Sequence, residues 1–148
     1  MSLPNEASFA VLKMGDGAGP EVFTVTCGIQ DINLNQIANT TDRLVRDCTK
    51  PGEVPNRKVK VTGKQADITA SGLTDKAQIE TLGDALGQIG NWKVELLQDD
   101  GTDSGLLLGT YAGSFALTAF NKSVPREGDS TVELTLASNG AWTWTAAV

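Results

Sequence analysis

The sequence predicts a mainly β fold: a β-sandwich or half-open barrel of two packed antiparallel sheets, with one flanking α-helix at about residues 75–89. Most segments alternate apolar and polar residues with a period of two, which is typical of strands with one wet face. Only one segment repeats its apolar residues at helical spacing. With 148 residues, 40% of them hydrophobic, the chain has the length of one domain. We therefore expect a single domain over residues 1–148, with a long polar loop at about residues 38–57.

The first strands are short and separated by turns. ASFAVLKM and EVFTV are predicted strands, joined by a hairpin turn in the glycine-rich GDGAGP. A phosphate-binding loop is disfavoured there, because no helix follows the glycines. The next strand, IQDINLNQ, sets Ile32 and Leu34 on one face and Asp31, Asn33 and Asn35 on the other.

The segment RKVKVTGKQADITASG changes the parity of its alternation at Gly63. Such a switch predicts a bulge or a sharp bend in one long strand. In a regular strand, the change of parity would place one of the two apolar sets on the solvent-exposed face. The apolar residues stand at odd positions before this glycine and at even positions after it, namely Val59 and Val61, then Ala66, Ile68 and Ala70.

The predicted helix lies in LTDKAQIETLGDALGQIGN. Asp75 is placed to cap its start, with Gln78 three residues on, and Gly90 is placed to end it. Gly83 and Gly87 each cost about 1 kcal/mol relative to alanine, so we expect the helix to depend on packing against a sheet. The residues expected to form that packing stripe are Ile79, Leu82, Leu86 and Ile89.

Strands resume after the helix in WKVELLQ, LLLGTYAGSFALTAFN and STVELTLAS, with turns in DDGTDSG and KSVPREGD. The last strand is expected to run into a turn at Asn139 and Gly140. Its alternation sends Val132, Leu134 and Leu136 inward and leaves Thr131, Glu133 and Thr135 for a channel or a neighbour.

Composition excludes several classes of function. The chain has 18 acidic and 12 basic residues and a net charge of -6, which argues against a surface that grips nucleic acid. It has no histidine, so a zinc site and a histidine-activated nucleophile lack their ligands and base. QDDGTDSG lacks the final glutamate of a calcium loop and is predicted to be a solvated hairpin tip. We expect no catalytic residue, no metal site and no cofactor.

The amino end carries no pattern of an export signal, and no stretch approaches the roughly 18 apolar residues of a membrane helix. We therefore expect a soluble protein with no membrane partner. Cys27 and Cys48 allow one bridge, for which the intervening segment would have to fold as a hairpin about Asn39. Without an export signal, two reduced thiols are favoured. Trp142 and Trp144 share one strand face, where they can seal a core edge or a subunit contact, or stack on a sugar.

The order of these elements resembles the tail tube (major tail) proteins of long-tailed bacteriophages, of the siphophage type. The resemblance rests on DGAGPEVFTVTCGIQDINLNQ, the polar IANTTDRLVRDCTKPGEVPNRKVKVTG, a strand ending in Ser-Gly, the single helix DKAQIETLGDALGQIG, and the closing strand DSTVELTLASNG. It covers nearly the whole chain, and the extension AWTWTAAV departs from it. The wider family includes the tube proteins of type VI secretion systems.

The resemblance implies a non-enzymatic subunit that self-assembles into hexameric rings, which stack into a tube whose lumen conducts the genome. Its implied partners are other copies of itself and the tape-measure, tail-tip and tail-terminator proteins, with DNA as transient cargo. Its implied location is the virion tail, after synthesis in the cytoplasm of the bacterial host. The alternative is a β-sandwich module that binds a carbohydrate or a receptor through the two tryptophans.

Two sets of residues follow from this interpretation. An acidic or neutral lumen withholds cations from the DNA backbone and lets it slide, and the polar partners of core residues are its candidate lining: Asp31, Asn33, Asp67, Glu133 and Thr135. Part of the long polar loop is expected to be mobile in the free subunit and to become ordered between rings. Its candidate contact residues are Asp42, Arg43, Arg46, Lys50 and Glu53.

Overall fold

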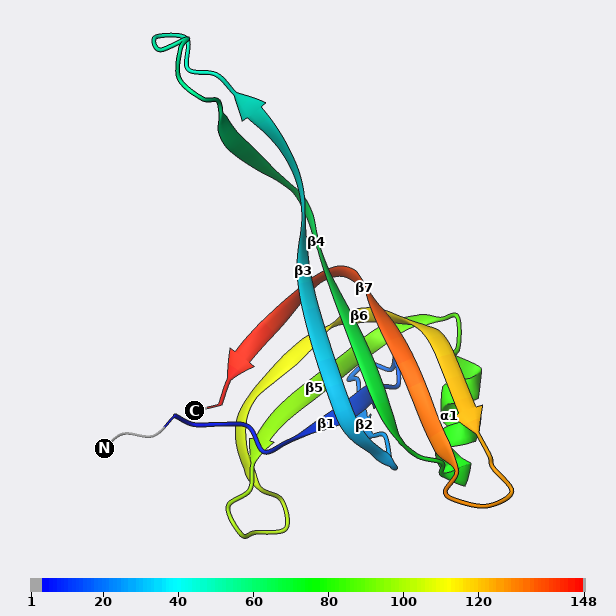
Figure 1. Cartoon of the computed structure of the whole chain (residues 1–148). Helices are drawn as coiled ribbons and strands as arrows, with labels where there is room; N and C mark the ends of the chain where they lie inside the picture. The colour runs from blue at the N-terminus through cyan, green and yellow to red at the C-terminus, as the bar shows by residue number, and fades with distance from the viewer. Residues whose placement is uncertain (1–3, 148) are drawn as a thin grey trace.

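The computed structural model describes residues 4–147, and in them it shows seven strands and one helix. The prediction of a mainly β fold with a single helix is confirmed (Figure 1). In chain order the elements are β1 (Phe9–Gly15), β2 (Phe23–Val25), β3 (Ile29–Val45), β4 (Asn56–Leu73), α1 (Lys76–Ala85), β5 (Ile89–Gln98), β6 (Leu106–Ser123) and β7 (Thr131–Ala146).

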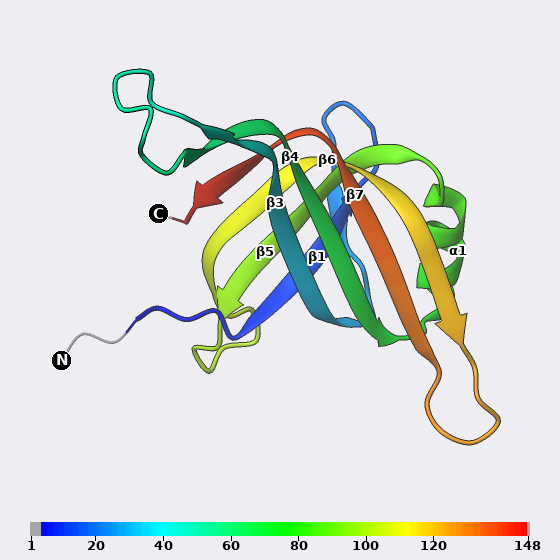
Figure 2. The ribbon, with the colours of Figure 1, turned by 45° about the horizontal axis from the view of Figure 1, so that its top comes forward.

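All seven strands belong to one antiparallel sheet, in the order β2-β1-β5-β6-β7-β4-β3. The expected sandwich of two packed sheets is not seen in residues 4–147. The sheet is instead strongly curved (Figures 1 and 2), and it brings β1 and β3 within 8 Å of each other, Cα to Cα, although these strands do not pair. One curved sheet therefore encloses the core that two sheets were expected to share.

The reason for the single sheet is a bend within β7. The pairing of β7 with β6 moves from Ser138 opposite Phe115 to Trp142 opposite Gly113, so β7 holds extra residues at this point. Gly140 lies there with φ 101°, a conformation that glycine adopts freely. The expected turn at Asn139 and Gly140 is therefore wrong, because these residues form a bulge that bends β7 without ending it.

The buried side of the sheet agrees with the predicted alternation. Val132, Leu134 and Leu136 are at most 1% exposed, as expected for the closing strand. They pack with apolar residues from β1, β4, β5, β6 and α1, which include Leu12, Ile68, Val94, Leu117 and Leu82.

The parity switch in β4 is a β-bulge, as predicted. Asn39 pairs with Gly63, whereas Thr40 pairs with Val61, so Thr62 is the extra residue. The Thr62 hydroxyl donates a hydrogen bond of 3.0 Å to the carbonyl oxygen of Asn39 across the two strands. The buried Ala66, Ile68 and Ala70 thus keep the core side of β4.

The expected polar loop at about residues 38–57 is a loop only in its central part. Residues 38–45 continue β3 and residues 56–57 begin β4, paired from Ala38 opposite Lys64 to Val45 opposite Asn56. The strands were not predicted here because their residues have no buried face and therefore do not alternate between apolar and polar types. Together they form a hairpin that projects far from the rest of the sheet (Figure 1). We call residues 38–64 the arm.

Helix α1 is shorter than expected. Asp75 caps its start as predicted, since its side chain accepts a hydrogen bond of 3.4 Å from the backbone N–H of Gln78. The helix ends at Ala85, and Gly87 follows with φ 82°. The expected end at Gly90 is wrong, because this residue already belongs to β5.

The expected packing stripe of the helix is mostly wrong as well. Leu82 is 1% exposed and lies in the core, but Ile79 is 40% exposed and Leu86 is 48% exposed. Ile89 belongs to β5 and is 61% exposed. The buried face of α1 instead combines Leu82 with Gln78, a polar residue that no apolar pattern identifies.

Both cysteines are free and exposed. They lie beyond opposite ends of β3, whose 17 residues span roughly 50 Å of extended chain. No hairpin forms about Asn39, so the bridge that such a hairpin would allow cannot close.

We predict that Leu82→Ala lowers the free energy of unfolding by about 2–5 kcal/mol, because it opens a cavity beneath the helix. Ile79→Ala on the same helix is the control and should lower it by less than about 1 kcal/mol, since Ile79 is largely exposed. Urea unfolding of the subunit measures both values. Equal losses for the two variants would contradict the burial of Leu82 in the core.

We also predict that Cys27 and Cys48 both react with a thiol reagent in the folded, unassembled subunit. The reaction should give two thiols per chain without denaturant, because both side chains are exposed. A titre that reaches two only after unfolding would contradict this exposure.

Candidate functional site

Polar residues cover the outer side of β3, β4 and β7 in rows that cross the three strands. Residues directly opposite each other in antiparallel strands share a face, so the pairing places three residues in each row. The three rows are Asp31, Ser71 and Glu133; Asn33, Thr69 and Thr135; and Asn35, Asp67 and Ala137. We call these nine residues the polar sheet face.

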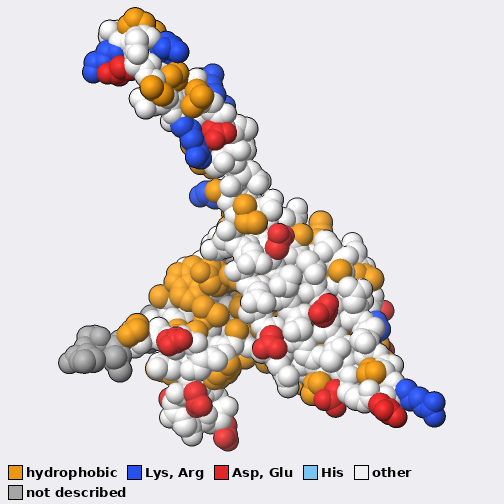
Figure 3. Space-filling model, viewed as in Figure 1, with side chains coloured by type: hydrophobic (Ala, Val, Ile, Leu, Met, Phe, Trp, Pro, Cys, Tyr) orange, Lys and Arg blue, Asp and Glu red, His pale blue; other side chains and the backbone are white. Residues whose placement is uncertain are grey.

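The structure brings all five candidate lining residues together on this face. The core residues of the same strands, such as Ile68 and Leu134, point to the opposite side and are buried. The face carries three carboxylates, from Asp31, Asp67 and Glu133, and no lysine or arginine. Figure 3 shows it as a mostly uncharged surface with scattered acidic side chains. The face is therefore polar and mildly acidic, and it carries no cationic side chain to attract phosphate.

Two edges of the sheet beside this face have no strand partner within residues 4–147. β3 is the last strand in the sheet order, so no strand is hydrogen-bonded to its outer edge, although β1 comes within 8 Å of β3, Cα to Cα. β6 pairs with β5 only as far as Ala116, so the part of β6 that pairs with the start of β7 lacks a strand on its other side. Open edges present backbone N–H and C=O groups that can pair with another chain.

The arm is basic and the rest of the chain is acidic. Residues 38–64 contain seven basic and three acidic residues, a net charge of +4, which leaves five basic and fifteen acidic residues, a net charge of -10, on the remainder. The seven basic residues are Arg43, Arg46, Lys50, Arg57, Lys58, Lys60 and Lys64.

The turn at the end of the arm is held by its own polar groups. Arg46 donates hydrogen bonds to the carbonyl oxygens of Pro51 and Glu53, at 2.6 and 3.2 Å. Asp47 accepts bonds from the hydroxyl and the N–H of Thr49, and the hydroxyl bond holds the pKa of Asp47 below its usual value. These hydrogen bonds all join residues of the turn to one another.

The five candidate loop residues fall into two groups. Asp42 and Arg43 lie in β3, whereas Arg46, Lys50 and Glu53 lie in the turn of residues 46–55. Asp42 pairs with Arg57 at 3.1 Å, and Lys50 pairs with Glu53 at 3.8 Å. Both pairs are exposed and contribute little to stability.

The loop between β5 and β6, residues 99–105, is acidic. It contains Asp99, Asp100 and Asp103 and no basic residue. Asp100 accepts hydrogen bonds from the hydroxyl and the N–H of Thr102, and the hydroxyl bond lowers the pKa of this carboxyl. The loop projects from the end of the molecule opposite the arm (Figures 1 and 2).

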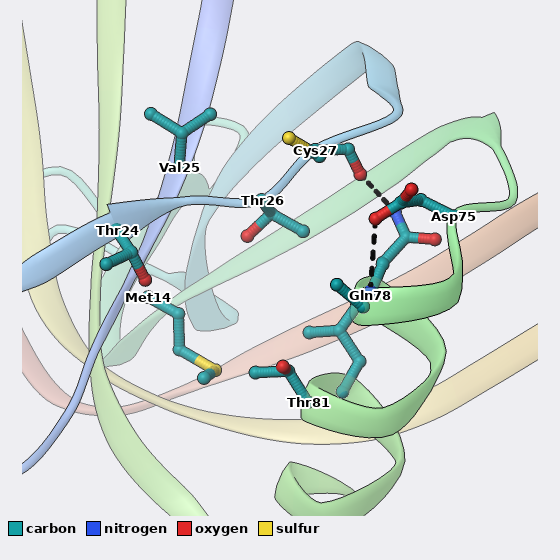
Figure 4. A pocket seen from close by; sticks show the side chains of 10 residues that line it. Met14, Thr24, Val25, Thr26, Cys27, Asp75, Gln78 and Thr81 are labelled. Atoms are coloured by element: carbon teal, nitrogen blue, oxygen red, sulfur yellow. Dashed lines mark hydrogen bonds between the residues drawn. The ribbon is translucent and has the colours of Figure 1, made fainter.

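A small cavity of about 130 Å³ lies between β2 and α1 (Figure 4). It is smaller than common ligand pockets, which measure about 300–1,000 Å³. At its border the Gln78 side-chain amide donates a 2.7 Å hydrogen bond to the carbonyl oxygen of Cys27. This bond ties the helix to the segment that leads into β3, so we assign Gln78 a structural role.

The two tryptophans have structural surroundings. Trp142 packs against the core, and Trp144 lies beside Tyr111, with 4.6 Å between ring centroids. A methyl group on Gly109 would collide with the Trp144 ring, so this glycine makes room for it. Trp142 thus lies at an edge of the core, whereas Trp144 is 45% exposed.

Residues 4–147 contain no group of three or more Cys, Asp and Glu side chains placed to hold a metal ion. Their one helix is too short to cross a membrane.

A sequence model of a phage tail tube protein family matches residues 8–144. No match was found among curated proteins.

Solved structures share the fold over almost the whole chain. A subunit in the tail of an empty gene transfer agent particle, refined with C6 symmetry, is 20% identical, with a TM-score of 0.70 over 97% of this chain and 100% of that chain. A subunit of the PVC sheath-tube complex, an extracellular contractile injection system, is 17% identical, with a TM-score of 0.66 over 99% and 95%. The SPP1 tail tube protein is 10% identical, with a TM-score of 0.62 over 99% and 81%. At these identities the likeness concerns the fold.

Proposed function

The chain belongs to the phage tail tube protein family, and we propose that it forms hexameric rings that stack into a tube, with the polar sheet face lining a lumen for DNA. As a member of this family it is a structural subunit of a virion tail tube and not an enzyme. The proposal concerns the number of subunits, the surfaces that join them and the surface that meets the cargo.

The observation that carries the proposal is the composition of the polar sheet face. Three adjacent strands present small polar and acidic side chains in register, with the apolar residues of the same strands buried behind them. In a ring, each carboxylate of this face becomes a band of negative charge around the channel. Such a band repels phosphate, so a duplex can pass without binding.

The open edges support ring closure. β3 of one subunit and the unpaired part of β6 of its neighbour are the two edges of the strands that flank the polar sheet face. Pairing them would satisfy their backbone groups and join the faces of successive subunits into one continuous lining. A head-to-tail contact of this kind closes into a ring when the rotation between subunits fits. The gene transfer agent tail was refined with sixfold symmetry, and we propose the same symmetry for this chain.

The arm is the proposed contact between rings. It projects beyond the sheet (Figure 1) and carries exposed apolar and basic residues that its own subunit does not cover. We extend the proposal to a tape-measure protein in the lumen and to tip and terminator proteins at the ends of the tube, since a stack of rings leaves one unpaired surface at each end.

Deleting residues 49–55 should leave a folded subunit that forms no long tubes. The deletion leaves three residues between Val45 and Asn56, which pair in the wild type, and three residues suffice for a hairpin loop. Circular dichroism checks the fold, and negative-stain electron microscopy checks assembly. A control variant replaces the same seven residues with glycine and serine, which keeps the length but removes the side chains. Normal tubes from the deletion variant would mean that the turn has no part in stacking.

Glu133→Lys should permit rings and tubes but slow the passage of DNA, because six lysines at one level of the lumen would bind the phosphate backbone. Particles that carry the substitution are assayed for the rate of DNA ejection at several salt concentrations. The slowing should be strongest at low salt. The control is Glu80→Lys, an exposed position on α1 outside the polar sheet face, which should eject normally. Normal ejection by Glu133→Lys at low salt would remove Glu133 from the lining.

A further inference from the structure

The arm has two chemically different faces. Because opposite residues in the hairpin share a face, the exposed Leu44, Val59 and Val61 lie on one side. The ion pair between Asp42 and Arg57 lies on that same side. On the other side Arg43 lies directly opposite Lys58, and Lys60 lies opposite Thr41 in the neighbouring row. We call Arg43, Lys58 and Lys60 the basic face of the arm.

The basic face has no counter-charge of its own. Within residues 4–147 no carboxylate lies within 4 Å of Arg43, Lys58 or Lys60, whereas Lys50 and Arg57 elsewhere on the arm do have acidic partners. Like charges directly opposite in a sheet destabilise it. The isolated subunit therefore holds a repulsion that an acidic partner would relieve.

The opposite end of the molecule supplies the complementary charge. The loop of residues 99–105 carries a net charge of -3, and the loop of residues 124–130, with one basic and two acidic residues, carries -1. These loops project away from the arm (Figures 1 and 2), and the basic side chains seen in Figure 3 gather mainly on the arm. The arm, with a net charge of +4, thus lies at the opposite end of the molecule from the two loops, whose net charges add up to -4.

This distribution favours a second copy of the chain as the partner. When identical subunits stack with the same orientation, the arm end of one meets the loop end of the next, which brings the opposite charges together. Of the two loops, residues 99–105 are the better receptor because they contain no cation. Side-by-side contacts within a ring do not bring these two ends together.

Resting on the proposed stacking of rings, we propose that the basic face of the arm binds the acidic loop 99–105 of a subunit in the next ring. The contact is electrostatic and solvated, so it makes stacking sensitive to salt. Pairing of the open strand edges is much less sensitive to salt, because backbone hydrogen bonds carry it. Ring closure and tube growth then respond differently to ionic strength.

The test is a charge reversal with rescue. Lys58→Glu should raise the protein concentration needed for tubes roughly tenfold, since an attraction becomes a repulsion at six sites per ring, and Asp103→Lys should do the same. The double variant should assemble close to the wild type, because the pair is restored with its signs exchanged. Light scattering and negative-stain microscopy at about 50 and 300 mM salt give the readout, and the wild type should need more protein at the higher salt.

The control is Lys76→Glu, which reverses one charge at the start of α1, outside the arm, and should leave tubes unchanged. If Lys58→Glu behaves like this control, or if the double variant is as poor as the single ones, the proposed contact is overturned. Normal tubes from Lys58→Glu, together with loss of a salt-sensitive binding of duplex DNA that the wild type shows, would overturn it in favour of nucleic acid. A wild type that forms neither rings nor tubes at any salt would instead overturn the proposed function.

Discussion

The register between β4 and β7 is the constraint on which the rest of this structure depends. Ile68 pairs with Leu136 and Ala70 pairs with Leu134, so the apolar residues of both strands reach the core together. A slip of one residue would send them to water and bury the carboxylates of Asp67 and Glu133. The core therefore fixes the polar sheet face, although no residue of that face is needed for packing.

Two bulges lie beyond the paired residues of β4 and β7, one where β4 continues into the arm and one where β7 bends over the core. The extra Thr62 lets β4 leave the core and continue into the arm with its alternation reversed. As a result one face of the arm carries Leu44, Val59 and Val61 beside an ion pair, and the other face is basic. An uninterrupted strand would have distributed these residues differently. The bulge at Gly140 bends β7, so that its end can cover the core with Trp142 while its start supports the polar sheet face.

The separation of charge gives the molecule a direction. A tube that conducts DNA needs a lining without cations, yet the subunits also need contacts that are specific in orientation. Placing seven of the 12 basic residues on the arm meets both needs, because it removes them from the polar sheet face and gathers them at one end. The lack of cations on the polar sheet face and the opposite charges of the two ends thus follow from one distribution of residues.

The sequence by itself determined the strands that have a buried face, the buried residues of those strands and the single capped helix. These features follow from local periodicity, which a buried face imposes on every strand that has one. It also placed Asp31, Asn33, Asp67, Glu133 and Thr135 on polar strand faces, although only the pairing of β3, β4 and β7 shows that these faces are one surface.

Tertiary structure alone decided the features that the alternation of apolar and polar residues does not predict: the strands of the arm, the bulge at Gly140 and the buried face of the helix. The arm has no buried face, so its strands looked like a loop, and the glycine at position 140 has the same local signature in a turn as in a bulge. The helix stripe failed for a related reason. Ile79 and Leu86 are apolar but exposed, whereas the polar Gln78 is buried and donates a hydrogen bond to the carbonyl oxygen of Cys27. Which apolar residues meet the core depends on where the sheet lies, and the sequence of a helix does not contain that information.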